Sequence, residues 1–154
     1  PATRGAWRQR VTYVGDDQYP NGWDRDLHVY NADETARFQQ TADSSLVVQK
    51  IYGPSFPEVN AASGRRRPQA TDAVVRALNE GTLIWNYSGH GGITGLGSEG
   101  YFTRGVLNQL TNADRLALFI TATCSFGRYD MSERQSLAEE TLLYENGGAV
   151  AMLT

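Results

Sequence analysis

The chain has 154 residues, of which 40% are hydrophobic, and its formal net charge is −3 at pH 7. This composition suits one globular domain with a hydrophobic core and excludes disordered and collagen-like chains. The small negative charge gives no sign of a general affinity for nucleic acid, and no run of about 18 apolar residues is present that would span a membrane.

Strands and helices are predicted to alternate along the chain. Their order is a strand over 10–15, a helix over 31–42, a strand over 46–52, a helix over 69–81, a strand over 82–87, a helix over 103–110, a strand over 116–123, a helix over 136–148 and a strand over 149–154. A polar loop rich in Gly, Ser and Pro lies between the second strand and the second helix. This alternation predicts an α/β fold with a mostly parallel sheet and helices on both faces.

Local signals support several of these elements. The helix over 69–81 places Val74, Val75 and Leu78 on one face and ends at a glycine. The helix over 136–148 opens with a Ser-x-x-Glu capping box. The strand over 116–123 is almost continuously apolar, as expected for a strand that is buried on both faces of a sheet.

Two loops carry residues suited to chemistry at the carboxyl ends of predicted strands. The first reads NYSGHGG and contains His90, and the second reads TATCSFG and contains Cys124. Ligands of open α/β sheets bind outside the carboxyl ends of the strands. If the two strands are neighbours, an imidazole and a thiol project into one crevice as a potential nucleophile pair. The glycines around His90 permit a sharp turn and expose backbone N–H groups to a developing oxyanion.

Other functions of these residues have weaker support. A dinucleotide-binding turn would need a glycine where Thr94 stands, and the chain has no phosphate-binding GK[ST] loop. Cys124 is the only cysteine, so a disulfide within the chain and a cysteine-based zinc site are excluded. His28, His90 and a carboxylate are possible zinc ligands, but neither their spacing nor a motif supports this, and His28 is interpreted as a partly buried or surface ring. We therefore expect no metal and no cofactor.

The segments NYSGHGG and TATCSFGRYD, followed by SLAEETLLYENGGAVAMLT, resemble the gingipain-like cysteine peptidases. The resemblance implies a caspase-like three-layer sandwich in which His90 is the catalytic histidine and Cys124 the nucleophile. It also implies an oxyanion hole formed by the backbone N–H groups of Gly91 and Cys124. An acidic residue after the first strand supports the histidine in some members, and Asp16 and Asp17 are both candidates for that role here.

The domain organisation also follows from the resemblance. Residues 1–154 correspond to a single α/β domain, the C-terminal part of a gingipain-like peptidase domain that carries the catalytic Cys and His. An additional α/β half precedes this part in the family. We therefore expect the chain to be a piece of a larger protein, which agrees with its start at a proline and its end within an apolar run.

Within the family, WRQRVTYVGDDQ and SGRRRPQATDAVVRALNEGTLIWNYSGHGG most resemble the sortases of the type IX secretion system. That likeness implies removal of C-terminal sorting signals from secreted proteins and their attachment at the bacterial cell surface. The implied partners are proteins that carry a C-terminal sorting domain and outer-membrane secretion components. Two alternatives stay open: a secreted gingipain-like endopeptidase of general specificity, and a catalytically silent interaction module with the same fold.

Overall fold

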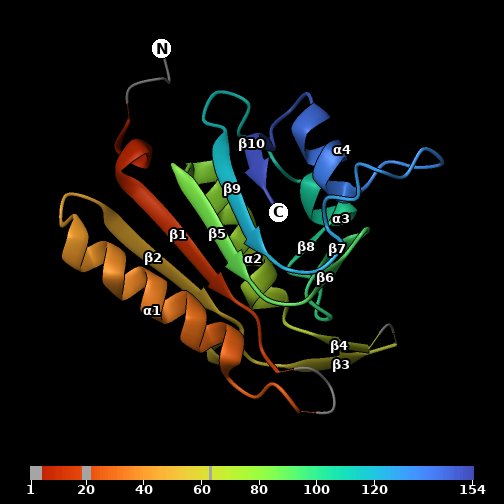
Figure 1. Cartoon of the computed structure of the whole chain (residues 1–154), viewed down its shortest axis with the longest axis horizontal. Coiled ribbons are helices and arrows are strands. Elements are labelled where there is room, and N and C mark those ends of the chain that lie inside the picture. The colour runs from red at the N-terminus through yellow and green to blue at the C-terminus, as the bar shows by residue number, and fades with distance from the viewer. Residues whose placement is uncertain (1–4, 19–21, 63) are drawn as a thin grey trace.

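The structure, a computed structural model, describes residues 5–18, 22–62 and 64–154. Five strands form a central sheet in the order β10-β9-β5-β1-β2, and all four pairings are parallel (Figure 1). The strands are β1 (Arg10–Gly15), β2 (Val47–Tyr52), β5 (Ile84–Ser88), β9 (Ala117–Ala122) and β10 (Ala149–Leu153). The predicted parallel sheet is confirmed, and each strand lies within about two residues of its expected bounds.

Helices cover both faces of this sheet. They are α1 (Leu27–Ala42), α2 (Pro68–Glu80), α3 (Arg104–Leu107) and α4 (Leu137–Leu143). Helix α1 runs along β1 and β2, whereas α2 passes behind β5 (Figure 1). Buried side chains of α1 and β1 form one apolar cluster, and those of α2, α3 and α4 join a larger one on the other face. The predicted three-layer sandwich is therefore confirmed, and no helix of the described residues is long and apolar enough to cross a membrane.

Aromatic packing between β5 and β9 forms the centre of the larger cluster. Trp85 and Phe119 are paired in register, are fully buried, and have ring centroids 4.6 Å apart. Phe102 contacts both rings. Each fully buried aromatic side chain stabilises the fold by roughly 1.5–3 kcal/mol. Pairing β5 and β9 in any other register would break these contacts.

The helices differ from their predicted bounds mainly at their ends. Helix α1 begins at Leu27 rather than at residue 31. The segment His28-Val29-Tyr30 is helical although all three residue types have a low helix propensity, which is why the sequence did not indicate it. The capping box of α4 is present, with Ser136 and Glu139 bonded reciprocally, but the helix ends at Leu143.

Short strands occupy two segments that were predicted to lack regular structure. A 3₁₀ turn and a two-stranded hairpin lie within the polar loop, and a three-stranded antiparallel sheet follows β5. These elements are the 3₁₀ turn Gly53–Ser55, β3 (Val59–Ala61), β4 (Gly64–Arg66), β6 (Gly91–Gly92), β7 (Gly95–Leu96) and β8 (Phe102–Thr103), with a further 3₁₀ turn at Ala6–Gln9. The glycine-rich strands β6 and β7 have too few side chains to show an alternating pattern.

The ends of β1 and β5 lie so close together that a side chain at residue 89 has no room. A Cβ atom on Gly89 would overlap Asp16 Cβ and the Tyr87 hydroxyl, whereas one on Gly92 would meet nothing within 4 Å. Gly89→Ala should therefore lower the free energy of unfolding by about 1–3 kcal/mol. Gly92→Ala should change it by less than about 0.5 kcal/mol. Urea unfolding of the purified variants, followed by tryptophan fluorescence, measures both; equal losses would contradict the close approach at Gly89.

Candidate active site

The register of β5 against β9 brings the two predicted functional loops to one place. The two strands are parallel neighbours, and their last paired residues are Ser88 and Ala122. His90 and Cys124 each follow two residues later, at equivalent positions beyond the ends of adjacent strands. The two strands are therefore neighbours, as the predicted nucleophile pair requires. The sequence could suggest this pairing but could not establish it.

Backbone contacts join the two loops directly. The Gly89 N–H donates to the Ala122 carbonyl oxygen at 3.2 Å. A Cβ atom on Gly91 would overlap Thr123 Oγ1, so only glycine allows this loop to lie against the residue before the cysteine. The glycines predicted to give a bare backbone around His90 thus have a structural purpose as well, because they let the two strand ends touch.

The chain turns sharply at Cys124. Strand β9 ends at Ala122, and Ser125 has a φ of 52°, in the left-handed region that non-glycine residues rarely adopt. Cys124 is exposed and has a free thiol. A strained turn directly after an exposed sulfur is typical of a functional position, where neighbouring structure holds an unfavourable backbone conformation.

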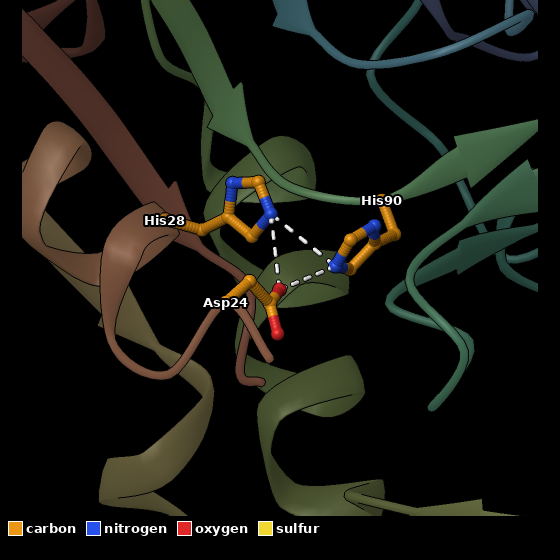
Figure 2. Close-up of side chains that lie close together, drawn as sticks. All are labelled: Asp24, His28 and His90. Carbon is orange, nitrogen blue, oxygen red and sulfur yellow. Dashed lines mark hydrogen bonds and ion pairs between the residues drawn. The ribbon is translucent and has the colours of Figure 1, made fainter. Parts of the chain in front are cut away.

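A carboxylate that the sequence did not reveal binds the ring of His90. Asp24 Oδ2 lies 2.6 Å from His90 Nε2, and the Asp24 side chain is completely buried whereas that of His90 is 21% exposed. Asp24 comes from the turn before α1, and His90 from the loop after β5 (Figure 2). With Nε2–H donated to this carboxylate, the Nδ1 nitrogen keeps a lone pair for acid–base chemistry.

His28 is partly buried, as one of its two interpretations had it, but it also lies beside His90. Its Nε2 atom is 3.3 Å from His90 Nε2 and 3.5 Å from Asp24 Oδ2 (Figure 2). The two imidazole rings meet edge to face, with centroids 4.6 Å apart. Burial lowers the pKa of His28, and the nearby His90 lowers it further, whereas Asp24 acts in the opposite direction.

The structure places the two predicted supporting acids away from the imidazole ring. Asp16 Oδ2 accepts hydrogen bonds from the backbone N–H of His90 and from the Tyr87 hydroxyl, both at 2.9 Å. Asp17 forms an ion pair with Arg67 at 2.8 Å. Asp16 therefore positions the His90 backbone, and Asp24 is the carboxylate at the ring.

Two groups of potential metal ligands occur among residues 5–18, 22–62 and 64–154. The first consists of Asp24, His28 and His90, and the second of Asp16, Asp17 and Glu99. Arginine pairs with two of the three acids of the second group, since Arg65 lies 2.5 Å from Glu99 and also reaches Asp17. The first group combines one carboxylate oxygen with two imidazole nitrogens.

A shallow hollow of about 210 Å³ adjoins His90. Its lining residues come from the histidine loop and the small antiparallel sheet: His90, Gly91, Gly92, Gly95, Gly97 and Ser98. Because five of the six have at most a small side chain, an extended backbone can approach the imidazole closely.

Comparison with known proteins agrees with this geometry. The model of peptidase family C25 matches residues 1–154. The chain belongs to peptidase family C25. It is thus a gingipain-like member of a family of cysteine peptidases, as its two motifs predicted. No curated protein sequence matches the chain.

Solved structures show the same fold. The crystal structure of the Arg-specific cysteine proteinase gingipain R matches with a TM-score of 0.71 and 20% identity, over 97% of this chain and 32% of that one. A complex of the Porphyromonas gingivalis RgpB pro- and mature domains matches with a TM-score of 0.63 and 20% identity, over the same shares. A structure described as a protease gives a TM-score of 0.62 and 17% identity, over 97% and 29%. The chain therefore spans about a third of the length of these proteins.

The buried Asp16 carboxyl makes stability depend on pH. Burial raises its pKa from 3.8 to about 6, although hydrogen bonds from His90 and Tyr87 oppose the shift. Between about pH 4 and 6 the folded chain keeps a proton on Asp16 that the unfolded chain has released. The free energy of unfolding should therefore fall as the pH rises through this window, by roughly 3 kcal/mol for this group. Asp16→Asn should flatten the slope, as measured by urea unfolding across that range.

Asp72→Asn is the matched control, because Asp72 is exposed on α2. This variant should keep the slope of the unmodified protein. If Asp16→Asn kept it as well, the carboxyl of Asp16 would titrate like an exposed one and its burial at the His90 backbone would be wrong.

Proposed function

We propose that this chain carries the catalytic dyad of a cysteine peptidase, with Cys124 as nucleophile and His90 as acid–base group. The observation that carries the proposal is the β5–β9 register, which sets the two residues at equivalent positions beyond adjacent strands. Membership of peptidase family C25 and the carboxylate on the far side of the imidazole also support it.

Asp24 decides which nitrogen of His90 reacts. Its carboxylate accepts the Nε2–H and stabilises the positive charge that the ring acquires when it takes a proton. The Nδ1 nitrogen is then the one that withdraws the proton from the Cys124 thiol. The thiolate attacks the peptide carbonyl carbon, and the resulting oxyanion accepts hydrogen bonds from the backbone N–H groups of Gly91 and Cys124. Each such donor is worth about 3–4 kcal/mol in comparable sites.

The tetrahedral intermediate collapses when His90 donates its proton to the departing amine, which leaves an acyl thioester on Cys124. Water as the second nucleophile completes proteolysis, and an amine completes transpeptidation. Both outcomes use the same residues, because only the molecule that enters the acyl-enzyme site differs.

Among these outcomes we favour a sortase similar to PorU of the type IX secretion system. Its substrates are secreted proteins with a C-terminal sorting domain, which it cleaves and helps to attach at the cell surface. The sequence resemblance around the first strand and before His90 supports this choice. On this view the protein acts at the outer membrane or outside the cell, with outer-membrane secretion components as partners.

A gingipain-like endopeptidase of general specificity is the second candidate. The fold shared with gingipain R favours it, and the open hollow beside His90 imposes no evident restriction on the peptide. A catalytically silent module is less well supported, because both motif residues are present and the sulfur is exposed.

Intact-mass spectrometry of the purified protein with a sorting-domain substrate tests the proposal. We expect a transient acyl adduct on Cys124 and release of the sorting domain. Cys124→Ala should abolish both, and Asp24→Asn should lower kcat by about 10²–10⁴-fold because the ring loses its charged partner. The exposed Asp72→Asn variant should match the unmodified protein.

Three other outcomes have defined meanings. Processing by Cys124→Ala would overturn both enzyme proposals. Equal cleavage of unstructured peptides and sorting-domain substrates would favour the general endopeptidase over the sortase. No adduct and no cleavage of either substrate class would favour the silent module.

A further inference from the structure

Three potential metal-ligating atoms lie together on the Nε2 side of the His90 ring. Asp24 Oδ2, His28 Nε2 and His90 Nε2 all lie within 4.8 Å of one another and point toward a common centre (Figure 2). The distances between the pairs are 2.6 Å for Asp24–His90, 3.3 Å for His28–His90 and 3.5 Å for Asp24–His28. One carboxylate oxygen and two imidazole nitrogens form a donor set typical of zinc sites.

The spacing of these atoms is close to that of a tetrahedral zinc site. Zinc binds nitrogen and oxygen at about 2.0–2.2 Å, so neighbouring ligands of a tetrahedral site are about 3.3–3.5 Å apart. Two of the three distances already agree with this value. Only the Asp24–His90 hydrogen bond would have to lengthen, by less than about 1 Å, as the metal replaces its proton.

The chain brings these ligands together from two segments that are far apart in the sequence. Asp24 lies in the turn before α1 and His28 in the first turn of that helix, with Asp24 Oδ2 and His28 Nε2 3.5 Å apart. His90 faces them from the loop after β5, and its backbone is fixed by Asp16. The side chains of His28 and His90 are 17% and 21% exposed, so an ion can enter and water can complete the coordination.

We propose that Asp24, His28 and His90 form a site for zinc or a similar divalent cation, and that its occupation switches off His90. Nitrogen donors favour zinc over magnesium and calcium, which prefer oxygen. A metal on Nε2 takes the place of the Asp24 hydrogen bond and fixes the remaining ring proton on Nδ1. The ring then has no lone pair with which to accept the Cys124 proton, and inhibition results without any occupation of the peptide site.

The binding half of this proposal is independent of the proposed function, whereas the inhibition rests on it. Isothermal titration of the metal-free purified protein with zinc chloride measures binding alone. We expect one zinc ion per chain at this site and no comparable heat with magnesium chloride. His28→Phe keeps an aromatic ring against His90 but removes the nitrogen, and it should weaken zinc binding at least about tenfold.

Cys124→Ala separates this site from a zinc ion held by the catalytic pair. Because the proposed ligands lie on the Nε2 side of the ring, this variant should bind zinc as tightly as the unmodified protein. Loss of zinc binding in Cys124→Ala, or unchanged binding in His28→Phe, would overturn the site. The measurement holds even if the protein proves to have no peptidase activity.

Steady-state kinetics test the inhibition. Zinc should lower kcat and leave KM unchanged, and a chelator should restore the rate. The zinc concentration for half inhibition should be at least about tenfold higher in His28→Phe than in the unmodified protein, when each rate is divided by the rate of the same protein without zinc. An increase in KM alone would place the ion in the peptide site and would contradict the proposal.

Discussion

The parallel register between β5 and β9 is the constraint on which the site depends. It is fixed by apolar packing, because Trp85 and Phe119 face each other in the buried layer against α2. A slip of one residue would turn every side chain of a strand to the opposite face. The packing that holds the core together therefore also places the loops that carry His90 and Cys124 beyond the ends of adjacent strands.

Two buried carboxylates hold His90 in position. Asp16, at the end of β1, holds the backbone N–H of His90, whereas Asp24, before α1, holds the ring. A negative charge this deeply buried is costly unless hydrogen bonds compensate for it, and both acids have such bonds. The cost is visible in the raised pKa of Asp16. The hydrogen bonds of the two carboxylates fix the position of the His90 backbone and the orientation of its ring.

The sequence was sufficient for the features that depend on local pattern. The alternation of predicted strands and helices along the chain predicted the parallel sheet with helices on both faces. The glycine-flanked histidine and the cysteine after an apolar strand predicted the two loops. It could not reveal Asp24 and His28, because their contact with His90 depends on β1 lying beside β5, a long-range pairing. The four-residue spacing of Asp24 and His28 at a helix start was a usable signal, but the predicted helix began at residue 31. The strands β6 and β7 could not be predicted, because their glycines give no alternation of apolar and polar side chains.

Chemical cross-linking tests most directly whether the imidazole and the sulfur share one cleft. A dihaloacetone such as 1,3-dibromoacetone alkylates a reactive thiolate first and then a nucleophile within a few ångströms of it. Mass spectrometry of a proteolytic digest should show a three-carbon bridge between Cys124 and His90. Attachment of Cys124 to another residue, or only singly alkylated Cys124 at full conversion, would contradict the placement of the two side chains in a common site.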